Sequence, residues 1–414
     1  MAFGSVIGAR RYVNKVFDID AKLGRLTDGR ASPTVPLAAV MSTWLWAMVK
    51  RLRSTERVGD LLKDERWRKI LGLKPEEGGS ADTAARTLDE LSIDELNEFL
   101  LDAFFVARRA GLLKDDGPYG LRCAIVDLNE LFASEKVHCE HCQMREKEVA
   151  DAGGQKRKVT EYFHQAVALV WAGGELAWPI NWELLAPGEG ELTAAYRLLA
   201  RLLPRLHESL DVVMGDALYC CRPFFKQVRD AGLVGLAIAS GQTEMDEEMA
   251  LLRQSEAATK QEGDIVRWEM ESEAWEKDVG QKLRVVHYER RYEAKPWKHE
   301  RRELRLVMTA PVAVIPSGQG WKVGRCRWKI ENGTFNILTR DYSLEHNYRH
   351  SPAAIAALLV LRSLAYCITM AYRRHATART KSTPGLLRWF ELVFIEDWVR
   401  YLDGALATAD PLSG

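Results

Sequence analysis

The chain has 414 residues, of which 47% are apolar and 28% charged, and its basic and acidic residues balance to a net charge of zero. This length and apolar content predict two or three structural units around a sizeable core and exclude wholesale disorder. The zero net charge excludes a uniformly basic nucleic-acid binder, although local clusters of Lys and Arg can still contact phosphates.

The cysteines and the longest apolar runs indicate the cellular compartment in which the protein is expected. Seven cysteines in a chain this long do not resemble a disulfide framework. The run closest to a membrane span, Ala353 to Tyr372, is interrupted by Arg362 and is expected to be a buried helix. Basic residues near the N-terminus are not followed by a long apolar region, so no signal peptide is expected. We therefore expect a cytoplasmic protein with no membrane partner.

Residues 1–110 are expected to be mainly helical and to form a DNA-binding N-terminal region. The stretch Val35 to Leu52 is rich in apolar residues, and Asp82 opens a second helix just after Ser80. The sequence Ser92-Ile-Asp-Glu95 has the pattern of a capping box, which begins a third helix. A compact helical unit of this size can dock DNA, although no recognition helix is specified.

Two acids follow strand-like runs in the middle of the chain. Leu121 to Val126 predicts a buried strand closed by Asp127, and Asp211 to Gly215 predicts another closed by Asp216. A hairpin of longer strands, turning at Gly173-Gly174, lies between them. Acids at the ends of two strands indicate a site at the carboxyl edge of an α/β sheet. For either acid alone, a loop Asp that caps the next turn is the alternative.

Residues 263–315 differ in composition from their surroundings. Three of their segments alternate in polarity, as antiparallel strands do, and the region is rich in Trp and basic residues. We expect a β-rich insertion here. After Pro352 the chain is expected to be helical again.

The segment Arg325–Arg340 is expected to be a helix with one buried apolar stripe. Arg327 and Glu331 lie four residues apart and share a face of that helix. A solvated ion pair is the simplest interpretation, but the apolar neighbours and the two strand-end acids favour a site. Three carboxylates can hold two Mg²⁺ ions, which in phosphodiester chemistry activate the attacking oxygen and stabilise the leaving one.

Several motifs, in family order over most of the chain, resemble the DDE transposases of bacterial insertion sequences. The similarity is to the insertion-sequence-4-like branch, whose ribonuclease-H-like core carries a β-strand insertion before the last acid. The segments that carry it are Ser80–Thr83, Val126-Asp127, Phe132–Ser134, Val137–Cys142, Thr160–Gln165, Gly215–Pro223, Arg327–Asn336 and Leu344–Asn347. The resemblance implies a metal-binding triad of Asp127, Asp216 and Glu331, with Arg327 as the family's basic residue.

The resemblance also implies the fold and its partners. The fold class is α/β, with a ribonuclease-H-like mixed-sheet core at residues 111–350, interrupted by the β-rich insertion at 263–315 and flanked by helical regions at 1–110 and 351–414. The implied transposase binds terminal inverted repeats and target DNA, acts as a homodimer on DNA, and cleaves and transfers strands with two Mg²⁺ or Mn²⁺ ions.

A catalytically silenced relative that only binds DNA is the alternative. Asp127-Leu-Asn replaces the Asp-Gly-Thr of many relatives. Gly324 and Leu338 stand where the wider group often has Tyr and Lys, and Arg340 is the candidate replacement for that Lys. All three acids are nevertheless present, which favours the enzyme.

DNA contacts are expected from the basic stretch Arg290 to Arg305 and from Arg340. Within that stretch the candidates are Arg301, Arg302 and Arg305. A Trp of the insertion can stack on an unpaired base at a transposon end. The candidates are Trp268, Trp275 and above all Trp297, with core packing as the alternative for at least two of them.

A separate cluster, His138, Cys139 and Cys142, is a candidate zinc site, because two thiols and an imidazole can bind Zn²⁺. A structural zinc site requires four ligands. The candidates for the fourth are His141, His164, Cys220 and Cys221. The alternative is a turn with reduced thiols after a strand.

Overall fold

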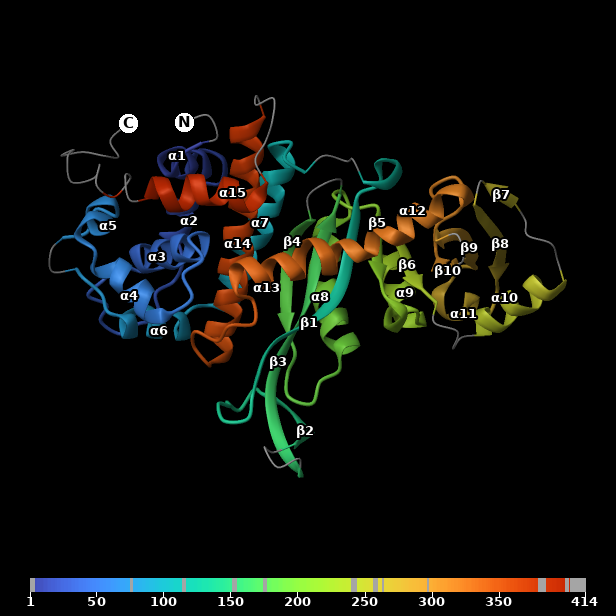
Figure 1. Ribbon diagram of the computed structural model, residues 1–414, viewed down its shortest axis with the longest axis horizontal. Coiled ribbons are helices and arrows are strands. Elements are labelled where there is room, and N and C mark those ends of the chain that lie inside the picture. Colours follow the sequence, from blue (N-terminus) through green and yellow to red (C-terminus); the bar gives the residue numbers. More distant parts are fainter. Residues whose placement is uncertain are drawn as a thin grey trace.

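The structure is a computed structural model in which residues 4–74, 77–113, 117–150, 155–173, 177–239, 244–255, 260–262, 264–295, 298–378, 385–398 and 402 are described. Helices near both termini lie at one end of the long axis, a mixed sheet lies in the centre, and the insertion lies at the other end (Figure 1).

The helices that precede the sheet pack with a long helix from the C-terminal part of the chain. They are α1 (Val6–Phe17), α2 (Ile19–Leu23), α3 (Leu37–Val49), α4 (Thr55–Lys63), α5 (Glu65–Ile70), α6 (Ala81–Asp89) and α7 (Ile93–Arg109). Helix α14 (Pro352–Thr377) contacts α1, α3, α6 and α7, and α15 spans Leu386–Phe390. Ser80 and Thr83 form a capping box at the start of α6, whereas Ser92 caps α7 through its side chain.

Helix α14 is the one helix in the described ranges that is long and apolar enough to cross a membrane. Of its most apolar stretch, 89% is buried inside the protein, as expected for a core helix. Arg362 lies on this helix with only 3% of its surface exposed and donates hydrogen bonds to the carbonyls of Leu344 and His346. The buried guanidinium therefore fixes the backbone of the segment before α14.

The central sheet has the strand order of a ribonuclease-H-like fold. Its strands are β1 (Cys123–Ser134), β3 (Lys156–Ala172), β4 (Ala177–Leu184), β5 (Val212–Gly215) and β6 (Val234–Ile238). The order is β4-β3-β1-β5-β6, in which the first three strands are antiparallel and β1, β5 and β6 are parallel. The expected ribonuclease-H-like mixed sheet is thereby confirmed.

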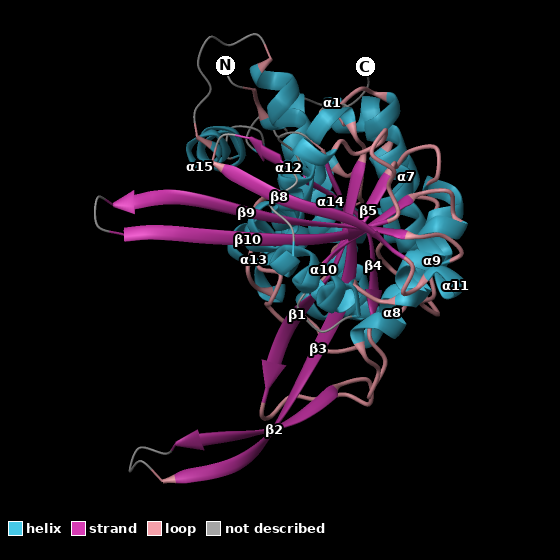
Figure 2. Ribbon diagram, turned by 90° about the vertical axis from the view of Figure 1, so that its right-hand side faces the viewer, coloured by secondary structure: helices cyan, strands magenta, loops and turns pink. Residues whose placement is uncertain are grey.

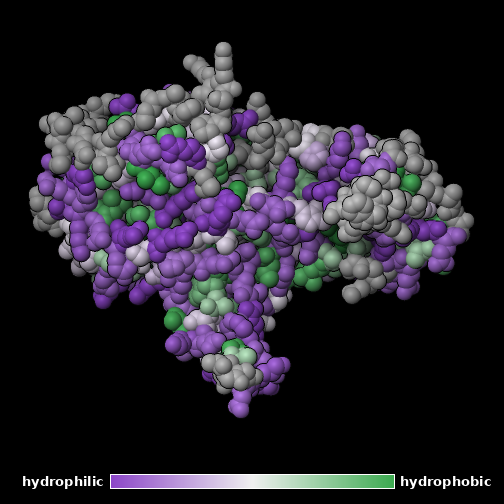
Figure 3. Space-filling view, in the orientation of Figure 1, coloured by the Kyte–Doolittle hydropathy of each residue, from purple (hydrophilic) through white to green (hydrophobic). Residues whose placement is uncertain are grey.

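Strand β1 is longer than its apolar core predicts. The expectation that Asp127 closes the strand is wrong, because pairing with β3 continues as far as Ser134, with a bulge between Glu130 and Phe132. A further strand, β2 (Gln143–Ala150), pairs with the outer half of β3. These outer halves project from the body as a ribbon (Figure 2) with a largely hydrophilic surface (Figure 3), so they lack the apolar pattern of a buried strand.

The insertion extends the same sheet. In the structure the insertion begins before residue 263, because α10 (Glu244–Ser255) and β7 (Lys260–Glu262) pack or pair with its strands. It continues with β8 (Ile265–Ser272), α11 (Glu276–Val279), β9 (Leu283–Lys295) and β10 (Lys298–Met308). Strand β10 pairs antiparallel with β6, with Leu306 opposite Ile238 and Met308 opposite Leu236. The central strands are thus one part of a ten-stranded sheet in the described ranges.

Helices cover both faces of the central strands. Helices α8 (Glu191–Leu206) and α9 (Arg222–Asp230) lie on one side, and α12 (Gly320–Arg325) and α13 (Asn336–Tyr342) on the other (Figures 1 and 2). Between α12 and α13 the helix is irregular, with a 3₁₀ turn at Cys326–Trp328 and a π-helical turn at Ile330–Phe335. The expected regular helix is therefore interrupted at Glu331, and π turns of this kind are frequent at functional sites.

Candidate active site

Two acids lie just beyond the residues through which the parallel strands β1 and β5 pair. In the β1–β5 pair, Ile125 lies opposite Met214, and two residues further along each chain comes an acid, Asp127 and Asp216. Neighbouring strands are about 4.8 Å apart, so the two carboxylates are neighbours. Asp216 also caps a short turn, because its Oδ1 accepts a hydrogen bond from the Leu218 amide at 2.8 Å. Asp216 can therefore cap this turn and also contribute its carboxylate to the site.

Arg327 connects the first acid to the last. Its Nη1 lies 2.8 Å from Glu331 Oε1 and 3.6 Å from Asp127 Oδ2. The Arg327 side chain is 11% exposed and that of Glu331 is 45% exposed. The pair is therefore more than a solvated contact along one helix turn, because its guanidinium reaches the acid on β1. Asp127 and Glu331, which are far apart in the sequence, therefore lie beside the same guanidinium, that of Arg327.

A fourth carboxylate, which sequence reasoning missed, belongs to the same cluster. Glu191 is the first residue of α8, and its Oε1 accepts a hydrogen bond from the Tyr219 hydroxyl at 2.9 Å. Burial raises the pKa of Glu191, and the nearby charge of Asp216 raises it further. An acid in the first turn of a helix is an ordinary feature in sequence. The sequence feature that could have indicated a further acid at the site was Tyr219, which lies three residues after Asp216.

The cluster carries more negative charge than its surroundings compensate. Burial raises the pKa of Asp127 to about 7, and the charges of Asp216 and Glu191 raise it as well, against the opposing effects of the Leu128 amide and Arg327. Neighbouring carboxylates with this excess of charge and oxygen donors fit a hard divalent cation such as Mg²⁺. Asp127, Asp216 and Glu331 can hold it, with Glu191 beside them.

The thiols of the predicted zinc cluster meet two imidazoles, but not that of His138. Cys139, Cys142, His164 and His350 place one donor atom each within 4.8 Å of all the others. His138 is exposed and stacks on Tyr162 with ring centroids 4.6 Å apart, so its assignment as a ligand is wrong. Of the proposed fourth ligands, His164 is in the cluster. His350 was missed because it lies 208 residues beyond Cys142.

Among the predicted DNA contacts on β10, Arg305 points inward. Its side chain is 18% exposed and forms an ion pair with buried Asp246, and its Nε lies 3.4 Å from His287 Nδ1. The expectation that Arg305 contacts phosphates is corrected accordingly, because its charge is already engaged. Arg302 is exposed on the same strand, and the side chain of Arg301 lies outside the described residues.

The remaining candidates divide in the same way. Arg340 is 64% exposed and pairs with the buried carboxylate of Asp341 at 2.9 Å. Trp275 is buried and donates from Nε1 to Glu244, so it packs in the insertion rather than presenting a face to DNA. Trp268 packs against His287 and Arg253. Trp297 lies outside the described residues.

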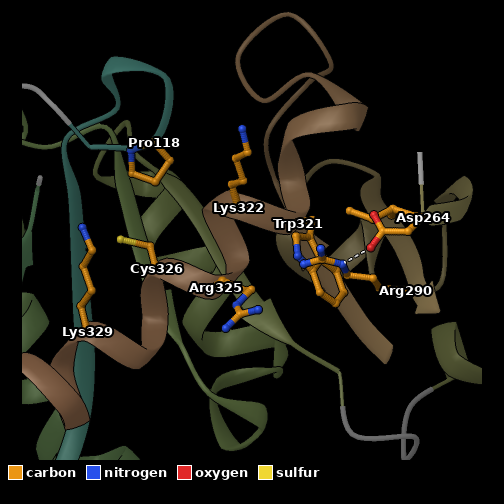
Figure 4. Close-up of a pocket in the computed structure, with 9 residues that line it drawn as sticks. Pro118, Asp264, Arg290, Trp321, Lys322, Arg325, Cys326 and Lys329 are labelled. Atoms are coloured by element: carbon orange, nitrogen blue, oxygen red, sulfur yellow. Dashed lines mark hydrogen bonds and ion pairs between the residues drawn. The ribbon is translucent and has the colours of Figure 1, made fainter. Parts of the chain in front are cut away.

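A basic pocket lies on the segment that leads to Glu331. It has a volume of about 460 Å³, and its lining includes Lys322, Arg325 and Lys329. Arg290 also lines it and is paired with Asp264 at 2.5 Å. Lys322 and Lys329, which are seven residues apart, extend in the same direction (Figure 4). The phosphate contacts expected from the sequence lie on β9 and β10 and at Arg340, so that expectation included Arg290 but not Lys322, Arg325 or Lys329.

The strand order and the carboxylates at the edge of the sheet define a ribonuclease-H-like α/β protein. The family model described as "Transposase DDE domain" matches residues 152–368, which is more than half of the chain. The chain therefore belongs to the DDE transposase family. The matched range contains Asp216 and Glu331, and it begins after Asp127.

Comparison with solved structures gives a distant likeness. The chain is similar to the transposase in "Cryo-EM structure of piggyBac transposase synaptic complex with hairpin DNA", with a TM-score of 0.44 and 12% sequence identity. The likeness covers 98% of this chain and 83% of that one. None of the curated proteins compared with the chain matches it significantly. Assignment to the insertion-sequence-4-like branch stays a prediction.

Proposed function

We propose that this protein binds the terminal inverted repeats of an insertion sequence and cleaves and transfers DNA strands with Mg²⁺ or Mn²⁺. The observation that supports the proposal is the convergence of three acids: Arg327 lies beside both Asp127 and Glu331, and Asp216 follows the strand that is paired with that of Asp127. Bound divalent ions supply activation of the attacking oxygen and stabilisation of the leaving oxygen in phosphodiester chemistry. The three acids are proposed as the ligands.

The chain's own residues prepare that chemistry. Arg327 holds Glu331 in position and provides the one guanidinium recorded next to Asp127 among the described residues. Tyr219 orients Glu191 through its hydroxyl, so the fourth carboxylate is held at the edge of the cluster. Because the pKa of Asp127 is about 7, its carboxyl is partly protonated at neutral pH and releases that proton when a cation binds.

The decisive experiment compares the wild-type protein with Asp216→Asn on DNA that carries the element's ends. Asn retains a side-chain oxygen that can accept the hydrogen bond from the Leu218 amide, so the turn is preserved. We expect wild-type cleavage in Mg²⁺ and none detectable in the variant, with equal DNA binding measured in Ca²⁺. Binding without cleavage by the wild type in both Mg²⁺ and Mn²⁺ would instead favour the silenced, DNA-binding relative.

The basic pocket provides a test of the DNA interface. Replacing Lys322 and Arg325 by Ala is expected to weaken binding to any DNA sequence, because phosphate contacts carry no base information. Each cation that neutralises a phosphate makes the plot of log K for DNA binding against log salt concentration steeper by about 0.9, so its removal should make the slope shallower by that amount.

Arg302→Ala on β10 is the matched comparison for that pair, because it removes one exposed cation from the stretch expected from the sequence. The measurement is a binding titration at several salt concentrations. A slope unchanged in the Lys322 and Arg325 double variant would remove the pocket from the interface.

A further inference from the structure

Four side chains beyond the acidic cluster lie at the spacing of zinc ligands. Cys139 Sγ and Cys142 Sγ are 3.8 Å apart, and His164 Nε2 lies 3.4 and 3.3 Å from them. His350 Nε2 lies 3.2 Å from Cys142 Sγ. We propose that these four residues bind one structural Zn²⁺, which ties the turn between β1 and β2 to the segment before α14.

The distances agree with tetrahedral coordination. Zinc bonds of about 2.3 Å to sulfur and 2.0 Å to nitrogen separate two sulfurs by about 3.8 Å and a sulfur from a nitrogen by about 3.5 Å. The observed separations of 3.8 Å and 3.2 to 3.4 Å lie close to both values. The sulfurs are too far apart for a disulfide, whose bond is about 2.05 Å. Two thiols and two imidazoles are a donor set that structural zinc sites use.

The turn that carries the thiols is shaped for them. Ser134 Oγ accepts hydrogen bonds from the amides of Lys136 and Val137, which starts the turn at the end of β1. The Cys142 amide donates to the Cys139 carbonyl at 3.1 Å, and the Cys139 amide donates to Cys142 Sγ at 3.3 Å. An amide that donates to sulfur stabilises the thiolate, which is the form that binds a metal.

The first imidazole comes from a rigid strand. His164 is on β3, opposite Phe132 of β1, and is only 2% exposed. The Phe132 ring lies against both imidazoles, with centroids 5.4 Å from His164 and 5.1 Å from His350. A polar ring this deeply buried requires polar partners, and the recorded partners of its Nε2 are the two thiols.

The second imidazole has an outer partner suited to a metal ligand. The side-chain amide of Asn347 lies 3.1 Å from His350 Nδ1, while Asn347 Oδ1 is buried and has no hydrogen-bond partner among the described residues. Turning the amide over makes Oδ1 the acceptor of the Nδ1 proton. That arrangement satisfies the buried oxygen and leaves the Nε2 lone pair directed at the thiols, as in the outer shell of histidine–zinc sites.

The bound ion would join parts of the chain that are far apart in sequence. The thiols and His164 belong to the catalytic sheet, whereas His350 ends the segment that runs from the Glu331 helix to α14. Arg362 already holds this segment through the carbonyls of Leu344 and His346. Zinc would add the connection to the sheet, so its removal should loosen both the β1–β2 turn and this segment.

The test is the metal content of the purified full chain, measured by mass spectrometry. We expect one zinc per chain in the wild type, and loss of that zinc in Cys142→Ser and His350→Asn. His138→Asn and Cys220→Ser, which alter neighbouring or equally buried groups outside the cluster, should retain it. Asp216→Asn should also retain it, so this result is independent of the proposed cleavage activity.

A second measurement needs no variant. Wild-type protein stripped of metal and reloaded with Co²⁺ should show thiolate-to-cobalt charge-transfer absorption and tetrahedral ligand-field bands, and its Tm should rise on addition of Zn²⁺. A wild-type chain that takes up neither metal, or a His350→Asn variant that retains stoichiometric zinc, would overturn the assignment.

Discussion

Replacing Glu331 by Gln is expected to reduce DNA strand cleavage by several orders of magnitude and to leave DNA binding intact. Gln has nearly the same shape as Glu but lacks the negative charge that a Mg²⁺ ligand supplies. If the bound ions serve both the attacking and the leaving oxygen, loss of one ligand impairs both. Binding rests on Lys, Arg and shape rather than on this acid. The measurements are cleavage of end-bearing DNA in Mg²⁺ and binding in Ca²⁺.

Glu345→Gln is the matched control, because Glu345 is an exposed carboxylate on the same stretch of chain whose recorded contact is the Thr339 hydroxyl at 3.3 Å. It should cleave at the wild-type rate. If Glu331 only paired with Arg327, its replacement would cost about 1 kcal/mol or less and leave cleavage nearly normal. Near-normal cleavage by a well-folded Glu331→Gln protein would refute the triad.

The parts of the fold that follow hydrophobic pattern were predictable from the sequence. The apolar run before Asp216 gives β5, and the alternating segments of the insertion give β8, β9 and β10. The outer half of β1 and all of β2 were not predictable in this way. They form a ribbon with polar faces, and a strand without a buried face leaves no periodicity in sequence.

The candidate site was predictable only where local pattern marks it. Asp127 and Asp216 were found from the apolar runs that precede them and Glu331 from helix spacing, but Glu191 begins a helix and His350 ends a loop, where such residues are common. Their importance comes from neighbours brought close by the tertiary fold, Tyr219 for the first and two thiols for the second. The burial of Arg305 against Asp246 likewise depends on how α10 packs on the insertion strands.

Replacing Asp127 by Asn is expected to stabilise the metal-free protein while abolishing cleavage. The pKa of Asp127 is raised from its ordinary value of 3.8 to about 7, chiefly by burial, so the folded protein holds this proton more tightly than the unfolded chain. The contribution of Asp127 to the free energy of unfolding therefore falls as pH rises from about 4 to about 7, and it does not change further above pH 7. The difference between the two pKa values corresponds to at most about 4 kcal/mol.

Asn resembles the protonated acid at every pH, so the stability of Asp127→Asn relative to the wild type should grow over that pH range. The comparison is made by denaturant unfolding in EDTA from pH 4 to pH 8. Asp211→Asn is the control of opposite sign: burial alone would raise the pKa of Asp211, but its hydrogen bonds with Arg122 outweigh burial and lower it. Removing that charge should destabilise the protein above pH 4.

Mg²⁺ should reverse the order of stability of the wild type and Asp127→Asn, so that the wild type becomes the more stable protein. A cation that binds the folded wild type compensates the charge of Asp127 and raises its stability with concentration, whereas the Asn variant lacks one ligand and should respond less. A wild type that is more stable than Asp127→Asn in EDTA at pH 8 would show that this carboxylate is compensated within the protein. In that case the excess negative charge, which is the physical reason for placing a divalent cation between β1 and β5, would not exist.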